Sequence, residues 1–358
     1  MLCGRVPAFP ITLVAVLWNI HAAETKGRRA LGTVPWRSRT QQGIFMKLNR
    51  ILKASIGVVL AGSFVGPSSA SMIGDAAGYN VFIFGSGSFT SQSTDTMGDL
   101  AAGGNVSLMN YSVAAGIKGT SANPNPARLV VGGTLTAKNG GVGSNQAGSI
   151  YTNSTPSLTS FTATGGVHAQ NLISSFSADQ TQYTNLSAGL AGLTANGATS
   201  GLLAGNTLDF TGTSSGLNVF DVTASTLSNS STINISAPTG STVLINVTGS
   251  GAVNFQNGSV NETGVSAASV LYNIVSSNVD LVGSKDPNGS ILAPHAGVTG
   301  GFGLMTGQLI TDSYNGNTQF DSAPFTGTLP AVPLPAAFWL LISGLAGLRT
   351  LVREKRAA

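Results

Sequence analysis

Short runs of alternating apolar and polar residues recur through the middle of the chain. From Leu208 onward they return about every 10–14 residues, and Gly, Ser, Asn and Pro separate them. Period-two alternation with regular turns predicts short β-strands. The runs are Tyr79–Phe84, Leu129–Val131, Thr207–Thr211, Val219–Val222, Thr232–Ser236, Val243–Val247 and Ala252–Phe255.

The repetition of these runs favours one β-architecture over another. Short strands whose spacing drifts from repeat to repeat are typical of a β-solenoid, in which each coil stacks on the next. A β-sandwich also has short, evenly spaced strands and is the alternative. We therefore expect a mainly β fold, with the solenoid as the first choice.

One segment, from Ala169 to Leu193, has a different period. Its apolar residues follow spacings of three, four and seven, which place them on one stripe of a helix. Turn-forming residues from Thr194 to Gly197 would end that helix. We expect one long amphipathic helix packed along the strands. The stripe consists of Leu172, Ile173, Phe176, Tyr183, Leu186, Leu190 and Leu193.

The composition suits a β-structure rich in turns. The chain has 358 residues, of which 42% are hydrophobic and 47 are Gly, so it can bury a large core. Only 8% are charged, against about 25% in ordinary soluble domains. The single cysteine is Cys3, which excludes a disulfide framework and a thiolate metal site.

The net charge of +4 belongs to the ends of the chain. Of the 17 Lys and Arg residues, nine lie in the first 53 residues and four in the last ten. Residues 71–331 hold four basic and eleven acidic residues, a net charge of −7. A nucleic-acid partner would require a basic patch, so none is expected. The basic residues of this stretch are Lys118, Arg128, Lys138 and Lys285.

Residues 46–70 have the layout of a secretory signal peptide. A charged region from Met46 to Lys53 precedes a short apolar stretch from Ala54 to Gly66. Small residues then end at Ala70, after which signal peptidase would cleave. Signal peptides stand at the start of a protein, so we expect residues 1–45 to be an over-extended N-terminus outside the fold. A long, genuine leader is the alternative.

The C-terminus, residues 330–358, combines a short motif, an apolar stretch and a basic end. The motif is followed by the apolar residues Ala337–Leu348 and by the basic cluster Arg353–Arg356, whose charge would stay in the cytoplasm. This layout resembles the VPLPA-type PEP-CTERM sorting signals of Gram-negative bacteria. The resemblance implies transient insertion of a transmembrane helix, cleavage by an exosortase and delivery to the surface. The motif residues are Val332, Pro333, Leu334, Pro335 and Ala336.

The body, residues 71–329, resembles the choice-of-anchor A family of surface proteins. The opening match is Phe82–Phe84 with Ala101–Val106, and the closing match includes Gly289–His295 and Ala323–Phe325. The resemblance implies a right-handed, ice-binding-like β-solenoid that acts as an adhesin. His295 stands where the family pattern has Asn or Asp, and Met97 and Asp99 stand where it has an acid and a base. A ligand role at these positions is therefore not implied.

The body offers little to catalysis. His168 and His295 are far apart and neither has metal-ligand spacing. Asp95 and Asp99 are the closest pair of acids, and we expect them to cap or face solvent in a turn. The segment Gly140–Asn145 resembles a single copy of a calcium-binding repeat. Such calcium sites need several stacked copies. We therefore predict no catalytic, cofactor or metal site.

Three functions remain for such a chain. The first is an exported, non-enzymatic adhesin or matrix protein of attachment or biofilm, which would hold extracellular polysaccharide, protein or mineral through many weak contacts. The second is a β-helical polysaccharide-active enzyme, which four basic residues in the body make the poorer choice. The third is an ice-binding protein, which would require rows of Thr in register. Signal peptidase and an exosortase would be partners during export in the first case.

Overall fold

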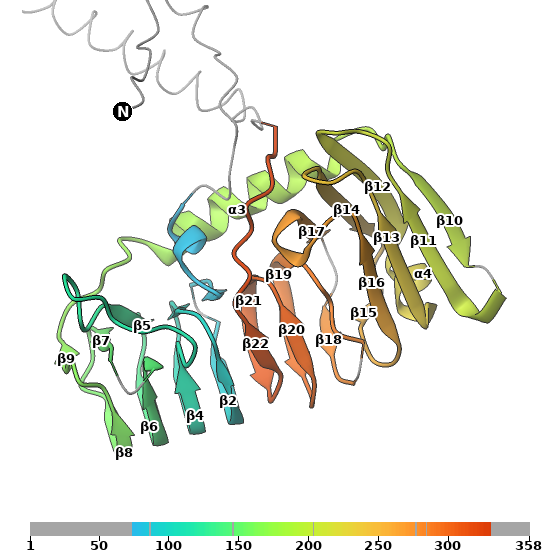
Figure 1. Ribbon diagram of the computed structural model, residues 1–358. Coiled ribbons are helices and arrows are strands. Elements are labelled where there is room, and N and C mark those ends of the chain that lie inside the picture. The colour runs from blue at the N-terminus through green and yellow to red at the C-terminus, as the bar shows by residue number, and fades with distance from the viewer. Residues whose placement is uncertain are drawn as a thin grey trace, which may run out of the picture. The chain divides into compact units, whose positions relative to one another are not determined.

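The computed structural model describes residues 74–330, apart from residues 86, 145–146, 203, 276–277 and 284. Most of the described chain forms β-strands that stack in parallel into coils (Figure 1). We call one coil of the stack a rung. Each rung has two main sides, the helix-covered face and the polar face.

The helix-covered face is buried on both sides except at its end strand β9, whose two residues are exposed. Its strands point one set of side chains into the solenoid and the other set toward helix α3, which is why they read as apolar runs. These strands are β1 (Val81–Ile83), β3 (Leu100–Ala102), β5 (Ala127–Val131), β7 (Ser149–Thr152), β9 (Val167–His168), β12 (Leu217–Thr223), β14 (Thr242–Thr248) and β17 (Val270–Ile274).

The polar face is buried on its inner side only. Its strands are β2 (Phe89–Thr96), β4 (Val106–Val113), β6 (Leu135–Val142), β8 (Ser157–Thr162), β15 (Val253–Asn254) and β18 (Val279–Leu281). Two long strands, β19 (Ser290–Gly300) and β21 (Leu309–Gly316), pass through both faces. Figure 1 shows β8, β6, β4 and β2 side by side.

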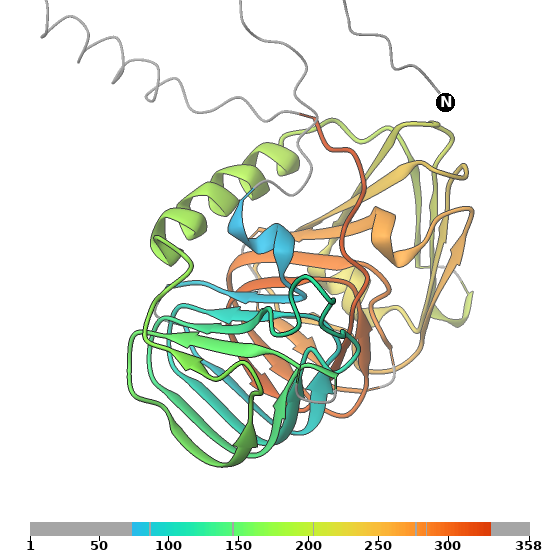
Figure 2. The same cartoon turned by 60° about the vertical axis from the view of Figure 1, so that its left-hand side comes forward.

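The rungs do not stack in the order of the sequence. Strand β1 pairs with β3 on one side and with β21, near the end of the body, on the other. The chain therefore builds the first rungs up to β9, crosses to the far end along α3, and coils back until its last rung meets its first (Figures 1 and 2). The two halves share one interior core.

The remaining elements complete the rungs. Strand β20 (Leu304–Thr306) pairs with β22 (Gln319–Asp321). A separate sheet consists of β10 (Ala198–Leu202), β11 (Thr207–Thr211), β13 (Thr232–Ser236) and β16 (Ser259–Thr263), where β10 is antiparallel to β11. Short turns of helix lie at Asp75–Gly78, Ala204–Asn206, α4 (Ala224–Asn229) and Ala267–Ser269.

The predicted amphipathic helix is α3 (Phe176–Ala191). Ser175 caps its start, because the side-chain oxygen accepts a hydrogen bond from the backbone N–H of Ala178 at 3.1 Å. Phe176 and Tyr183 pack on Phe82 of β1, and their ring centroids lie 5.4 and 6.4 Å, respectively, from the ring centroid of Phe82. The helix begins seven residues later than the stripe predicted, because the N-cap at Ser175 sets its first turn.

The predicted β-solenoid with one helix alongside is confirmed. A β-sandwich is built of antiparallel sheets, whereas every pairing described for the large sheet is parallel. The predicted over-extended N-terminus (residues 1–45), signal peptide (residues 46–70) and sorting tail (residues 330–358) lie outside the described residues, apart from Pro330. Within the described part of the chain, no helix is long and apolar enough to cross a membrane.

Candidate functional site: a flat polar face

Strict alternation produces the polar face on its first four rungs. Phe89, Val106 and Leu135 point into the core, and the residue after each of them is exposed. Because the strands pair in parallel and in register, these exposed residues stack directly above one another. The stacked hydroxyl residues are Thr90, Ser107, Thr136 and Ser157.

The same row continues into the rungs formed at the end of the body. Thr90 pairs with Asn315 of β21, and each further strand adds one polar residue. At a strand separation of about 4.8 Å, eight side chains span about 34 Å along the solenoid axis. We call this row the polar column: Ser157, Thr136, Ser107, Thr90, Asn315, Thr299, Asp280 and Asn254.

The two halves of the polar column differ in their hydrogen bonds. In the second half, Thr299 Oγ1 donates to Asp280 Oδ1 at 2.9 Å, and Gln256 Nε2 donates to Asp280 Oδ2 at 3.3 Å. Internal partners thus hold the one carboxylate of the column. Among the described residues, the four hydroxyls of the first half have no side-chain hydrogen bond, so they are free to bind an external partner. We call Thr90, Ser107, Thr136 and Ser157 the hydroxyl segment.

A shallow hollow of about 360 Å³ lies beside the second half of the column. Hydroxyl and amide side chains line it together with the apolar Ala252, Val279 and Val298, and Asp280 is its charged residue. Some of its backbone and amide groups already form internal hydrogen bonds, since Asn278 Oδ1 accepts a hydrogen bond from the backbone N–H of Gly297 at 3.2 Å. Its polar residues include Ser88, Asn278, Asp280, Thr299, Ser313 and Asn315.

A corner with left-handed backbone borders the polar face on the first four rungs. Four residues in register have positive φ, and none is Gly. Asn139 Nδ2 donates to Asn110 Oδ1 at 3.0 Å and links two of these rungs. Asn tolerates this conformation better than most residues. The four are Ser93 (φ 57°), Asn110 (φ 50°), Asn139 (φ 54°) and Ser160 (φ 51°).

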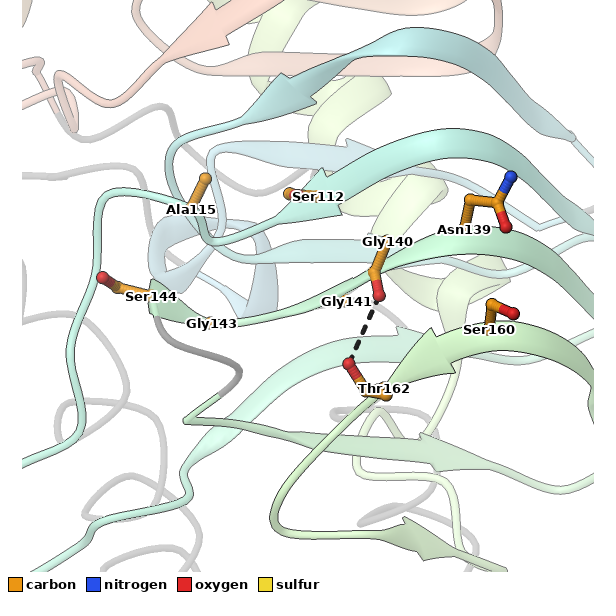
Figure 3. A pocket seen from close by; sticks show the side chains of 9 residues that line it. All are labelled: Ser112, Ala115, Asn139, Gly140, Gly141, Gly143, Ser144, Ser160 and Thr162. Atoms are coloured by element: carbon orange, nitrogen blue, oxygen red, sulfur yellow. Dashed lines mark hydrogen bonds between the residues drawn. The ribbon is translucent and has the colours of Figure 1, made fainter.

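Beyond this corner lies a second hollow of about 660 Å³ (Figure 3). It opens where Gly140 and Gly141 carry no side chain between Ser112 and Thr162. Thr162 Oγ1 donates to the carbonyl of Gly140 at 3.3 Å. None of the residues lining this hollow carries a charge, so it suits small uncharged polar groups.

The residues tested for chemistry from the sequence are not brought together. His168 stacks on Tyr151 with ring centroids 4.5 Å apart. His295 lies on β19, where its Nε2 is 3.3 Å from Thr184 Oγ1 of helix α3. In the part of the chain that the structure describes, no group of three His, Cys, Asp or Glu residues could hold a metal ion.

The expectation for Asp99 was wrong, because this side chain neither caps a turn nor faces solvent. Its Oδ1 lies 3.0 Å from Arg128 Nη1, with 18% and 10% of the two side chains exposed. Burial raises the pKa of Asp99 to about 6, although the Arg128 charge and hydrogen bond oppose the rise. Burial, and then Asp321, also raise the pKa of Asp95. The pairing makes Asp99 a structural residue.

The sorting motif Val332–Ala336 and the cleavage site after Ala70 lie outside the described residues. Apart from Ala252–Phe255, which covers β15, the apolar runs of the sequence did not predict the strands of the polar face. The signal was present in Phe89-Thr-Ser91, Val106-Ser-Leu108 and Leu135-Thr-Ala137, where a small polar residue alternates with inward-facing ones. Aligning these three triplets would have revealed the column.

Most of the described body matches a known family. A family model described as "Putative Ice-binding-like adhesive domain" matches residues 72–322. The chain belongs to this family. Among solved structures, the DUF3494 domain of Shewanella frigidimarina ice-binding protein 1 is similar, with 12% sequence identity and a TM-score of 0.33. The match covers 74% of this chain and 100% of that one. No curated protein matches the sequence.

Proposed function

We propose that this member of the ice-binding-like adhesive family is an exported bacterial adhesin whose polar face holds an extracellular polymer. The polar column is the observation that carries the proposal. It offers eight stacked polar side chains, of which the four of the hydroxyl segment have no side-chain hydrogen bond among the described residues. Many weak contacts repeated along a rigid surface give firm attachment without a deep pocket.

The sequence of the two ends of the chain supports the export that we propose. Signal peptidase would cleave after Ala70, and an exosortase would process the tail near Val332–Ala336 after its transient insertion in the inner membrane. The resemblance to choice-of-anchor A proteins with VPLPA-type PEP-CTERM tails supports this route, as does a family described as adhesive. The test is to fractionate cells with and without the exosortase and sequence both termini of the surface form. Retention of the tail on surface protein would contradict the proposal.

Binding is tested with a matched pair of double variants of the full chain. Thr90→Val with Thr136→Val replaces two hydroxyls of the hydroxyl segment by methyl groups of similar size. Thr211→Val with Thr263→Val makes the same change at exposed positions of β11 and β16 in the separate sheet. We expect the first pair to reduce attachment to polysaccharide-coated surfaces and the second to leave it unchanged. Equal attachment by both would contradict the proposal.

Ice binding is the second candidate, and one observation favours it. A regularly spaced row of exposed hydroxyls is a surface that can order water, and the family description contains the words ice-binding-like. The column is mixed, however, since Asn254, Asp280 and Asn315 stand where a uniform row would have Thr. Thermal hysteresis of the full chain, measured for the parent and for both double variants, decides this point. Hysteresis lost only with Thr90→Val and Thr136→Val would establish ice as the ligand.

An enzymatic role receives no support from the described side chains. The family is described as adhesive, the two histidines lie apart, and Asp99 is committed to Arg128. We therefore propose a non-enzymatic protein. A screen of the full chain against soluble and insoluble polysaccharides checks this proposal, and release of reducing ends or unsaturated products would overturn it.

A further inference from the structure

We propose that the hydroxyl segment binds an extended, uncharged β-1,4-linked polysaccharide that lies along the solenoid axis, across the strands. This inference rests on the proposed function and names the class of polymer that the polar face would hold. Three properties of Thr90, Ser107, Thr136 and Ser157 carry it: their spacing, their order and their surroundings.

The spacing of the hydroxyls fixes the direction and repeat of the ligand. The four residues follow one another by parallel pairing, so they are about 4.8 Å apart and span about 14 Å. In an extended β-1,4-linked chain of hexopyranoses, successive rings advance by nearly the same distance as successive strands. Each ring would therefore meet one hydroxyl. An α-1,4-linked chain coils instead and cannot keep this register on a flat row.

The order of the hydroxyls also has a period of two rungs. Thr90 and Thr136 alternate with Ser107 and Ser157 along the segment. Successive rings of a β-1,4-linked chain are turned over relative to one another, so the groups that face one side also repeat every two rings. Threonine adds a methyl group that can contact the C–H groups of one ring, whereas serine leaves room for the substituents of the next.

The surroundings favour an uncharged polymer. On these four rungs the next exposed row is Gln92, Met109, Lys138 and Thr159, with Lys138 as its only charge. The carboxylate of the column, Asp280, lies outside the hydroxyl segment and accepts hydrogen bonds from Thr299 and Gln256. The body carries a net charge of −7 over residues 71–331, which disfavours a polyanionic ligand at low salt.

The length of the segment sets the length of ligand that it can hold in register. One ring advances slightly more than one rung, so the mismatch accumulates with each added ring. Register is kept over the four hydroxyl rungs better than over the whole column. We therefore expect affinity to rise with chain length up to about four or five rings and then to level off.

The experiment is a calorimetric titration of the full chain with β-1,4-linked gluco-oligosaccharides of two to eight rings. The matched probes are α-1,4-linked oligomers of the same lengths and a β-1,4-linked polyuronate. We expect length-dependent binding of the β-linked glucan alone. Loss of two hydrogen bonds in Thr90→Val with Thr136→Val should weaken it about tenfold, while Thr211→Val with Thr263→Val should leave it unchanged.

The other possible results separate failure of the proposed ligand from failure of the proposed adhesin. Equal binding of α-linked oligomers, affinity independent of length, or tighter binding of the polyuronate would overturn the proposed ligand while leaving an adhesive polar face in place. If no saccharide binds but the hydroxyl double variant still loses attachment to whole surfaces, the ligand proposal fails and the adhesin stands. If neither binding nor attachment responds to the double variant, both fail.

Discussion

Ser187 of helix α3 and Asn273 of strand β17 exchange two hydrogen bonds across the interface between helix and solenoid. Ser187 Oγ donates to Asn273 Oδ1 at 2.6 Å, and Asn273 Nδ2 donates to the carbonyl of Ser187 at 2.9 Å. Asn273 Nδ2 also reaches Asn246 Oδ1 at 2.9 Å, and Asn246 Nδ2 donates to the carbonyl of Leu190 at 3.0 Å. Two stacked asparagines thus help to fix the register of the helix, together with Gln180, whose Nε2 donates to the carbonyl of Pro294 and to Asp312 Oδ1, each at 3.1 Å.

Asn273→Ala should therefore loosen the helix. The change removes three buried hydrogen bonds and leaves the amide oxygen of Asn246 without its donor, so we expect a loss of about 2–3 kcal/mol in the free energy of unfolding. Urea denaturation measures this loss, and hydrogen exchange should show faster exchange along α3. Thr181→Ala, on the exposed side of the same helix, is the control and should change stability little.

The sequence predicted part of the fold, and the burial of the strands explains which part. Most strands predicted from the sequence belong to the helix-covered face, such as Val243–Val247, or to the separate sheet, such as Thr232–Ser236, while Ala252–Phe255 covers β15 of the polar face. Both kinds have side chains that are buried enough to read as apolar. The solenoid and its helix followed from that pattern. The pairing of β1 with β21 did not, because nothing local to either strand specifies a partner 228 residues away.

The polar face was harder to predict for a related reason. Its exposed positions hold small polar residues that also fill the turns of this chain, so alternation there is faint. Residues such as Asn110 and Ser160, whose positive φ interrupts the strands, break the period of two after four or five positions. Strands of this kind become visible only when successive rungs are aligned on one another.

Arg128→Met tests the ion pair with Asp99. In this variant the Asp99 carboxylate stays buried without its cation. Removing one partner of a buried ion pair lowers the free energy of unfolding by about 3 kcal/mol. The cost should be largest above pH 7, where Asp99 is ionised. It should be smaller near pH 4.5, because the folded-state pKa of about 6 leaves Asp99 protonated there.

Thermal or urea unfolding at the two pH values measures this difference. The double variant Asp99→Asn with Arg128→Met is the control, since it removes both charges and should restore part of the stability at pH 8. Equal destabilisation by Arg128→Met at both pH values would show that the arginine acts through packing and its bond to the carbonyl of Lys118 rather than through charge.

Glu262→Gln should stabilise the protein at alkaline pH. Glu262 Oε1 and the nearby Tyr272 Oη are buried without hydrogen-bond partners among the described residues. Burial raises the pKa of Glu262 to about 7, and a hydrogen bond from the backbone of Ala267 only partly opposes it. The folded state therefore binds the proton more tightly than the unfolded chain, so the stability of the parent falls as pH rises from about 4 through 7.

The measurement is the melting temperature of parent and variant at pH 5 and pH 8. Glutamine keeps the shape without the charge, so the two proteins should match at pH 5, and the variant should melt at a higher temperature at pH 8. A variant that is less stable at both pH values would mean that Glu262 accepts a hydrogen bond which glutamine cannot replace.

Asn110 tests the left-handed corner that borders the polar face. At φ 50° a β-branched residue is strained, so Asn110→Val should cost about 2 kcal/mol. Asn110→Gly should be nearly neutral, because glycine adopts this conformation freely and loses only an exposed hydrogen bond to Asn139.

Ser107→Val, three residues earlier on the same strand and exposed, is the control and should leave stability within about 0.5 kcal/mol. Chemical denaturation of the three variants gives the order directly. If valine and glycine at position 110 were equally tolerated, the corner would not depend on its backbone conformation, and the asparagine side chain would have to act through Asn139 alone.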